Sequence, residues 1–169
     1  YQRIVDLKTA ELFRVSCSLG AKLAGFSPAY VAAASSFGRH LGIAYQIYDD
    51  LVDFFGEEGR IGKTLGTDLA SGKLTLPLLA LRDRLPADEA AALAAEIAGE
   101  RPPALAVRLR QMRDLGVFSA VAGEVQNEIA AARAALENAG REEPPTARLL
   151  ELCEVLRVQV DGLEAMAAR

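Results

Sequence analysis

A run of acidic side chains followed by two lysines is the part of this sequence best suited to chemistry. Asp49, Asp50 and Asp53 lie in an otherwise apolar stretch, and Lys63 and Lys73 follow it, each directly after a glycine. Carboxylate oxygens are the ligands that hard divalent cations prefer, and Mg²⁺ usually binds one or two carboxylates together with the phosphates of its substrate. Lysine ammonium groups hold phosphates as point charges. The combination predicts a site for Mg²⁺ and a diphosphate.

The spacing of the three aspartates suits a helix. Asp49 and Asp53 are four residues apart, so on a helix their Cβ atoms lie about 5–6 Å from each other on one face. Asp50 is turned from Asp49 by about 100° around the axis, and Gln46 lies about one turn before the acidic pair. Acidic pairs on helices are often only solvated surface. Here the apolar flanks, the glutamine and the two Gly-Lys pairs favour a metal site.

The segment from Tyr45 to Pro77 resembles the second aspartate-rich region of the trans-isoprenyl diphosphate synthases, the polyprenyl synthetase family. In that family Phe-Gln is followed, after two residues, by DDxxD and then by GKxxGxDLxxGKxTLP. This sequence departs from the pattern only by Tyr45 in place of Phe. The matching positions are Gln46, Asp49, Asp50, Asp53, Gly62, Lys63, Gly66, Asp68, Leu69, Gly72, Lys73, Thr75, Leu76 and Pro77.

An upstream segment resembles the family helix whose Lys-Thr pair contacts an allylic diphosphate. It contains Lys8 and Thr9, with Tyr1 and Ile4 before them and Phe13 after them. A Lys-Thr pair alone is weak evidence and is usually just surface, but its spacing to the aspartates agrees with the family.

Together the two matches imply an all-α fold, the C-terminal part of an isoprenoid (terpenoid) synthase helical bundle. They also imply a prenyltransferase that condenses an allylic diphosphate with isopentenyl diphosphate. Such an enzyme elongates a linear isoprenoid diphosphate and releases pyrophosphate by ionisation that Mg²⁺ assists. The family resemblance further implies a homodimer.

The resemblance assigns roles to the acidic side chains. It implies that Asp49 is a direct ligand of Mg²⁺, and that Asp50 and Asp53 act mainly through metal-bound water. Preorganised cations aimed at a leaving diphosphate are the strongest means of stabilising the charge that develops on it.

The resemblance also assigns roles to the basic and polar side chains. Lys8 and Lys63 are expected to contact the allylic diphosphate, and Lys73 to support the loop or the same phosphates. Thr9 and Gln46 are expected near the reacting allylic carbons, where their oxygens favour positive charge.

The first aspartate-rich motif of the family, and the basic residues that hold isopentenyl diphosphate, are not found in this sequence. The chain begins at Tyr1, without Met. We therefore expect residues 1–169 to be the C-terminal part of a single longer all-α domain, inactive when alone. Residues 1–86 would carry the site and residues 87–169 the scaffold helices. If the protein isolated from its natural source had a mass of about 18.0 kDa and began at Tyr1, this expectation would be wrong.

Two other functions stay open at this point. A class I terpene cyclase ionises the same kind of allylic diphosphate but quenches the cation internally, and it would lack the tandem Gly-Lys loop around Lys63 and Lys73. A non-catalytic subunit or inactive fragment of a prenyltransferase would contribute helices only. Retention of the aspartates and lysines argues against the second alternative, whereas the missing first motif favours it.

Composition excludes several other classes of partner. The net charge is −4 with both signs dispersed, so there is no basic stripe for nucleic acid and no polybasic cluster for anionic lipid. No apolar run approaches the roughly 18 residues of a spanning helix, so stable membrane insertion is not expected. Cys17 and Cys153 lack CxxC spacing and fit reduced thiols of the cytoplasm. His40 has no ligand partner and fits a structural helical position.

The sequence predicts helices almost throughout. It is rich in Ala, Leu, Glu and Arg and has no Trp, which favours closely packed helices. We expect one helix over 4–25 and a second from Pro28 to Phe55. A loop over 56–72 and a helix with Thr75 as N-cap and Pro77 in the first turn come next. The later helices are expected over 87–98, 104–115, 117–139 and 146–169.

Overall fold

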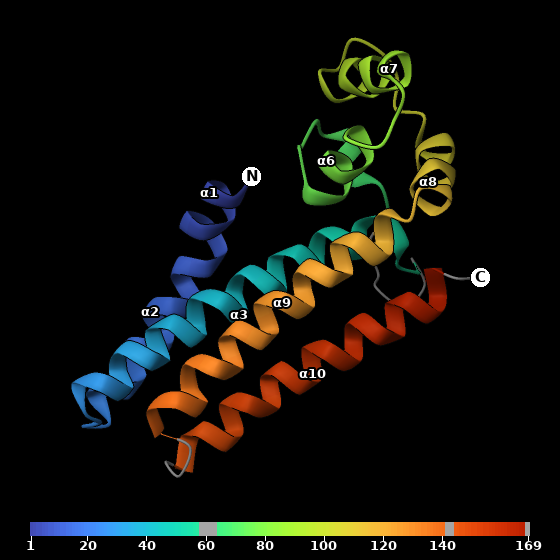
Figure 1. Cartoon of the computed structure of the whole chain (residues 1–169). Helices are drawn as coiled ribbons and strands as arrows, with labels where there is room; N and C mark the ends of the chain where they lie inside the picture. Colours follow the sequence, from blue (N-terminus) through green and yellow to red (C-terminus); the bar gives the residue numbers. More distant parts are fainter. Residues whose placement is uncertain (58–63, 141–143, 168–169) are drawn as a thin grey trace. The chain divides into compact units, whose positions relative to one another are not determined.

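The computed structural model describes residues 1–57, 64–140 and 144–167, and every regular element within these ranges is helical (Figure 1). The all-α expectation is therefore confirmed. No described helix combines the length and hydropathy of a bilayer-spanning segment. In chain order the elements are α1 (Gln2–Val5), η1 (Asp6–Ala10), α2 (Glu11–Leu23), α3 (Pro28–Phe55), α5 (Thr67–Ala70), α6 (Leu76–Arg82), α7 (Ala87–Ile97), α8 (Leu105–Asp114), α9 (Val117–Gly140) and α10 (Pro144–Ala167).

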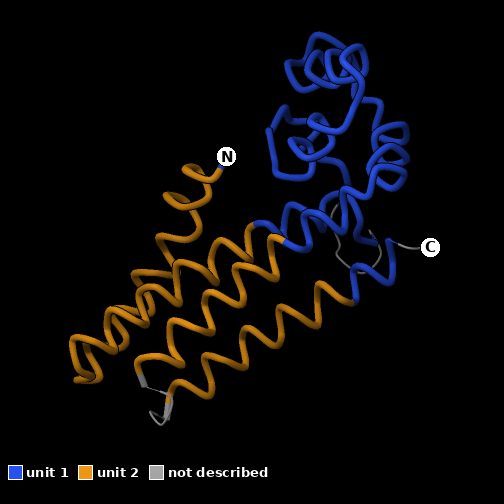
Figure 2. Tube along the Cα trace, viewed as in Figure 1, with its two compact units in different colours: residues 1, 47–123, 162–169 blue, residues 2–46, 124–161 orange. Residues whose placement is uncertain are grey.

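The chain divides into two compact units (Figure 2). Helices α3, α9 and α10 each contribute residues to both units. The division expected at residue 86 stays a prediction. Unit 1 consists of Tyr1, Ile47–Gly123 and Gly162–Arg169, and unit 2 consists of Gln2–Gln46 and Glu124–Asp161.

The core of unit 2 is made by apolar side chains at helical spacing. In α9, Val125, Ile129, Ala132 and Leu136 are all buried. Steps of three and four residues place them on one face of the helix, which therefore packs against its neighbours. The other buried apolar residues of this unit are Val5, Ala10, Ala21, Tyr30, Ala33, Ala34, Phe37, Leu41, Ala44, Cys153, Leu156 and Val160.

Two glycines let α3 pack very closely on the first helical segments of unit 2. A Cβ added to Gly38 would lie 2.5 Å from the carbonyl oxygen of Phe13. A Cβ added to Gly42 would lie 2.7 Å from the Cα of Ala10. Both obstacles are backbone atoms, which cannot move aside as a flexible side chain can. The absence of a side chain at these positions therefore sets the distance between the two helices.

We expect Gly42→Ala to destabilise the protein by about 1–3 kcal/mol, because the new methyl group overpacks a tight helix crossing. Gly123→Ala is the matched control. Gly123 is also in a long helix, but apart from its chain neighbours and its own helix backbone, no atom of the described residues lies within 4 Å of its Cβ position. Alanine there should stabilise the helix by roughly 0.5–1 kcal/mol. Urea unfolding of the two variants checks both signs, and a raised midpoint for Gly42→Ala would contradict the close packing.

His40 forms a contact between helices, and the two cysteines are not joined in a disulfide. His40 Nδ1 lies 2.7 Å from Glu128 Oε2, a hydrogen bond between α3 and α9 within unit 2. Both cysteines are free thiols. Burial raises the pKa of the Cys153 thiol to about 11 and also raises the pKa of Cys17. His40 thus has a hydrogen-bond partner on a neighbouring helix of the same unit.

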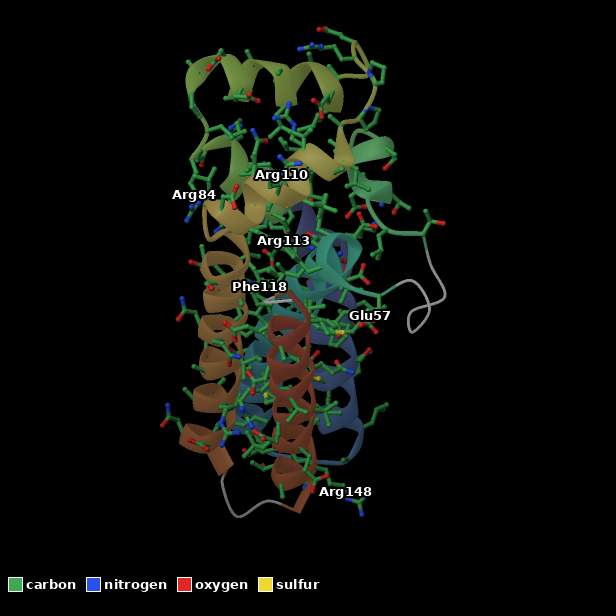
Figure 3. The ribbon with its side chains drawn as sticks, turned by 90° about the vertical axis from the view of Figure 1, so that its right-hand side faces the viewer. Glu57, Arg84, Arg110, Arg113, Phe118 and Arg148 are labelled. Atoms are coloured by element: carbon green, nitrogen blue, oxygen red, sulfur yellow. The ribbon has the colours of Figure 1, made fainter. Side chains whose placement is uncertain are left out.

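Unit 1 contains the end of α3 and the shorter helices α5 to α8. Its core includes an edge-to-face pair of rings, Phe55 and Phe118, with centroids 5.2 Å apart; Phe118 is labelled in Figure 3. Edge-to-face pairs add stability beyond the area that they bury. The other buried apolar residues of this unit are Ile47, Leu51, Phe54, Leu69, Leu78, Leu81, Leu93, Met112, Val117, Val121, Ala122 and Leu163.

A buried ion pair joins α7 to α8. The Arg108 guanidinium contacts both carboxylate oxygens of Glu96, at 2.6 and 3.2 Å, and both residues are at most 5% exposed. Glu96 also accepts the backbone N–H of Ala104 at the start of α8. Arg108 donates further to Glu89 and to Gln111. The fork geometry satisfies most of the polar atoms that the pair takes out of water.

Most expected helices are confirmed, with three corrections. The helix expected over 4–25 contains a turn of π-helix at Asp6–Ala10, which apolar spacing alone does not reveal. The loop expected over 56–72 contains the short helix α5. Thr75 occupies the N-cap position of α6 and Pro77 its first turn, but the Thr75 hydroxyl caps no N–H. Its Oγ1 is buried and has no hydrogen-bond partner among the described residues.

Candidate functional site

The three aspartates at the end of α3 have different surroundings. Asp49 is exposed, Asp53 is half-buried and Asp50 is only 5% exposed. Asp49 and Asp53 line the same small cleft of unit 1, as their four-residue spacing on a helix predicts. Asp50 instead accepts a hydrogen bond from the Tyr1 hydroxyl. Three acids that are equivalent in the sequence are therefore distinct in the structure.

Asp53 anchors the end of the glycine-rich loop. Its Oδ1 accepts the Thr67 hydroxyl at 2.7 Å and the Thr67 backbone N–H at 3.2 Å. Its Oδ2 accepts the backbone N–H of Asp68 at 3.0 Å. These two N–H groups begin α5 and have no partner within that helix. The Asp53 backbone carbonyl also accepts the N–H of Gly66 at 2.7 Å, so this aspartate fixes the loop to α3.

Asp68 and Lys73 form an ion pair beside Asp53. Lys73 Nζ lies 2.7 Å from Asp68 Oδ1, and the aspartate side chain is 9% exposed. The hydrogen bond and charge of Asp68, followed by the charges of Asp53 and Asp50, raise the pKa of Lys73. The ammonium group therefore stays protonated beside the acids. Its side chain is 63% exposed, which leaves it accessible to a ligand.

Two loop glycines lie against α7 and α8. Gly66 has φ +71°, and a Cβ there would lie 2.4 Å from a methyl carbon of Leu105. Gly72 has φ +69°, and its Cβ would lie 2.6 Å from the carbonyl oxygen of Ile97. The left-handed backbone and the lack of space both require glycine at these positions. The glycines of the motif thus fit the loop against the helices that follow it.

The cleft beside the loop has a volume of about 90 Å³ and brings acidic and basic groups together. It is lined by Asp49, Val52, Asp53, Thr64, Leu65, Thr67, Asp68 and Lys73. Oxygen ligands of this kind suit Mg²⁺, which keeps several waters and shares its coordination with substrate phosphates. Within residues 1–57, 64–140 and 144–167, no three acidic, histidine or cysteine side chains could hold a metal ion unaided.

Tyr1 donates a hydrogen bond to the buried acid Asp50. Its hydroxyl donates to Asp50 Oδ2 at 2.5 Å. Burial of the phenol, together with the charge and hydrogen bond of Asp50 and the charge of Asp68, raises the pKa of Tyr1 above its ordinary value. The phenol therefore remains a hydrogen-bond donor at all physiological pH values.

The Lys-Thr pair lies in unit 2 on the π-helical turn η1. Thr9 is half-buried, and its hydroxyl donates to Gln46 Oε1 at 2.6 Å. Lys8 is exposed. Single π-turns often occur at functional sites because they change the direction of side chains within a helix. The structure thus brings Thr9 and Gln46 into contact, whereas Lys63 lies outside the described residues.

Comparison with known proteins identifies the family. The sequence pattern of the family described as polyprenyl synthetase matches residues 1–110. The chain belongs to the polyprenyl synthetase family. The match runs from α1 into the first part of α8 and so includes both the Lys-Thr turn and the acidic cleft.

Individual polyprenyl synthetases resemble this chain over its matching segment. The octaprenyl diphosphate synthase of Haemophilus influenzae is 44% identical over 79 residues, which are 47% of this chain and 24% of that protein. The geranylgeranyl diphosphate synthase of Mycobacterium tuberculosis is 45% identical over 80 residues, 47% of this chain and 23% of that protein.

Solved structures of polyprenyl synthetases resemble nearly the whole chain. A polyprenyl synthase from Roseobacter denitrificans has a TM-score of 0.83 and 29% identity, over 94% of this chain and 52% of that one. A geranylgeranyl pyrophosphate synthase from Corynebacterium glutamicum, complexed with isoprenyl diphosphate and magnesium, has a TM-score of 0.81 and 27% identity, over 94% and 46%. The chain thus spans about half the length of these solved polyprenyl synthetases.

Two residues of this polyprenyl synthetase chain are site neighbours that sequence reasoning left without a role. Tyr1 and Asp68 both match the family pattern, yet only the structure gives their partners, Asp50 and Lys73. For Asp68, its place between the two Gly-Lys pairs was an available signal. Nothing in the sequence connects Tyr1 with an aspartate 49 positions away.

Proposed function

We propose that the full-length protein containing this chain is a prenyltransferase. It would condense an allylic diphosphate with isopentenyl diphosphate and so elongate a linear isoprenoid diphosphate. The observation that carries the proposal is the meeting of Asp49, Asp53, Asp68 and Lys73 at one cleft. The family membership supports it, because relatives of this chain are named octaprenyl and geranylgeranyl diphosphate synthases.

The proposed reaction breaks the bond between the allylic carbon and the diphosphate oxygen. Pyrophosphate leaves with the bonding electrons, and an allylic cation remains. The double bond of isopentenyl diphosphate attacks that cation, and loss of one proton completes a chain five carbons longer. Mg²⁺, when bound, would neutralise the charge that develops on the leaving diphosphate.

The three aspartates are proposed to have different roles in binding Mg²⁺. Asp49 is exposed at the cleft and is the proposed direct ligand of Mg²⁺. The oxygens of Asp53 already accept hydrogen bonds from Thr67 and Asp68, which supports a role through metal-bound water. Asp50 is proposed to act in the same indirect way. A carboxylate with oriented donors holds bound water in a fixed place.

The basic residues would hold the phosphates. Lys73, paired with Asp68 and accessible from solvent, is proposed to support the loop and to contact the diphosphate. The proposal keeps Lys8 and Lys63 as contacts of the allylic diphosphate on the strength of the family pattern. Ammonium groups aimed at the leaving group stabilise the transition state without rearrangement during the reaction.

Thr9 and Gln46 are proposed to favour positive charge on the allylic carbons. Because the Thr9 hydroxyl donates its hydrogen bond to Gln46 Oε1, the lone pairs of its oxygen can face a cation. We expect Thr9→Val in the full-length enzyme to lower kcat about 10-fold or more, with the size set by the loss of one oriented dipole. Single-turnover kinetics with saturating substrates check this. An unchanged rate would remove Thr9 from the reaction.

Incorporation of radiolabelled isopentenyl diphosphate by the full-length protein tests the proposed function. An elongated linear product supports the prenyltransferase. A cyclic hydrocarbon formed from the allylic diphosphate alone supports a class I terpene cyclase. Absence of any product, in the presence of Mg²⁺ and a range of allylic diphosphates, supports a non-catalytic subunit. The same assay on residues 1–169 alone tests the expected inactivity of the isolated chain.

We also propose that the full-length enzyme is a homodimer, as the family resemblance implies, and that it lies in the cytoplasm, where free thiols such as Cys17 and Cys153 stay reduced. Light scattering after size-exclusion chromatography measures the mass directly. A monomeric mass at assay concentrations would contradict this part of the proposal.

A further inference from the structure

We propose that Tyr1 is a positioning residue of the diphosphate site, whose phenol holds the Asp50 carboxylate in one orientation. The inference rests on the proposed function and deepens it. It assigns to Tyr1 a role toward a buried acid at the end of α3, where the metal-binding residues lie.

The geometry of the contact is that of a strong hydrogen bond. Tyr1 Oη lies 2.5 Å from Asp50 Oδ2, within the range of hydrogen bonds between a hydroxyl and an ionised carboxylate. Asp50 is only 5% exposed, so water cannot easily replace the phenol. Burying a carboxylate is costly unless donors satisfy its oxygens, so the phenol contributes to holding Asp50 in place.

The neighbouring acids show why a donor is needed there. Asp53 has the N–H groups of Thr67 and Asp68, and Asp68 has the ammonium group of Lys73. Tyr1 supplies the corresponding donor to Asp50. The phenol therefore orients Asp50, as these other donors orient the neighbouring acids.

The orientation of Asp50 matters for the site because Asp50 is proposed to hold metal-bound water, and such outer groups affect metal affinity. Replacing such partners typically costs about 10–100-fold in metal affinity or activity. A purely structural phenol would affect folding alone. The two roles differ in their effect on divalent-cation binding, which can be measured apart from turnover.

The experiment compares Tyr1→Phe with the wild type in the full-length protein. Binding of Mn²⁺ in the presence of inorganic pyrophosphate is followed by electron paramagnetic resonance. We expect the affinity for Mn²⁺ to fall about 10-fold. In the elongation assay, the Mg²⁺ concentration for half-maximal rate should rise by a similar factor, with little change in the KM for isopentenyl diphosphate.

Tyr30→Phe is the matched control. Tyr30 is 2% exposed, and its hydroxyl shares a 2.9 Å hydrogen bond with Thr146. This variant also removes a tyrosine hydroxyl from a buried position, but the hydrogen bond that it removes involves no carboxylate. We expect its Mn²⁺ affinity and Mg²⁺ dependence to match those of the wild type. An equal loss in both tyrosine variants would overturn the proposal.

Asp50→Asn tests whether Tyr1 acts through Asp50. If it does, adding Tyr1→Phe to Asp50→Asn should weaken Mn²⁺ binding no further. Additive losses would overturn the proposal, and so would wild-type Mn²⁺ affinity in Tyr1→Phe. Loss of helical circular dichroism in Tyr1→Phe but not in Asp50→Asn would assign the phenol to folding and also overturn it. A wild type that binds Mn²⁺ but forms no elongated product would refute the proposed function while the comparison of variants still judges Tyr1.

Discussion

Asp49→Ala in the full-length enzyme is expected to lower kcat for prenyl transfer by about 10²–10³-fold or more. Asp49 is the exposed acid of the three, and it lines the cleft together with Asp53, Asp68 and Lys73. As the proposed direct ligand, it would hold the cation that faces the leaving diphosphate. Its loss would therefore affect the transition state more than the bound substrate.

Steady-state kinetics at saturating Mg²⁺ and substrates measure this effect, and circular dichroism checks that the helices are intact. Asp83→Ala is the matched control, because Asp83 is an exposed acid that pairs with its neighbour Arg82 on the surface. The control should retain wild-type turnover. If Asp49→Ala also retains wild-type turnover, Asp49 has no role in binding the metal.

Arg108→Ala is expected to destabilise the protein by about 3–5 kcal/mol, the usual cost of leaving a buried charge without its partner. The guanidinium is the main partner of the Glu96 carboxylate, which is only 5% exposed. Removal of both charges should destabilise the folded protein less than removal of one. We therefore expect Arg108→Met combined with Glu96→Leu to be more stable than Arg108→Ala.

Urea unfolding measures these differences, and Arg110→Ala is the control. Arg110 belongs to the same helix but is exposed; it is labelled in Figure 3. Its replacement should change stability by less than about 0.5 kcal/mol. An equal effect of Arg108→Ala and Arg110→Ala would contradict the importance of the buried pair.

The same pair should make stability depend on pH. Burial raises the pKa of Glu96, but the hydrogen bonds from Arg108 and the Ala104 N–H outweigh it, so the pKa is lowered overall. A lowered folded-state pKa gives stability that is present above the unfolded-state pKa and is lost as the pH falls through the folded-state value. The stability difference between wild type and Arg108→Ala should therefore narrow in acid.

The long helices could be predicted from the sequence because their signals are local. The buried residues Val125, Ile129 and Leu136 of α9 recur at helical spacing, and the glycines and prolines mark the ends of the segments. Helix α5 could not be predicted in this way. It has four residues, too few for a periodic pattern, and its first N–H groups bond to Asp53, 14 and 15 positions earlier.

The residues of the candidate site could be predicted from the sequence, but the burial and contacts of each one could not. The spacing of Asp49 and Asp53 correctly placed them beside one another on α3. It could not show that Asp50 is buried, because its partner Tyr1 is 49 positions away. Likewise, the glycine-rich pattern identified Lys73 but not its ion pair with Asp68. Contacts made by distant parts of the chain distinguish these otherwise similar acids.

The fit of Gly66 against Leu105 and of Gly72 against Ile97 bears on any attempt to transplant this motif. A designer who copied only the aspartates and the loop onto another helical host would lose the two surfaces that shape the loop. Helices α7 and α8 supply neither the cleft aspartates nor Lys73, but they pack against Gly66 and Gly72 and so limit the conformation of the loop. A successful graft would need to carry them along, together with the ion pair that locks them to each other.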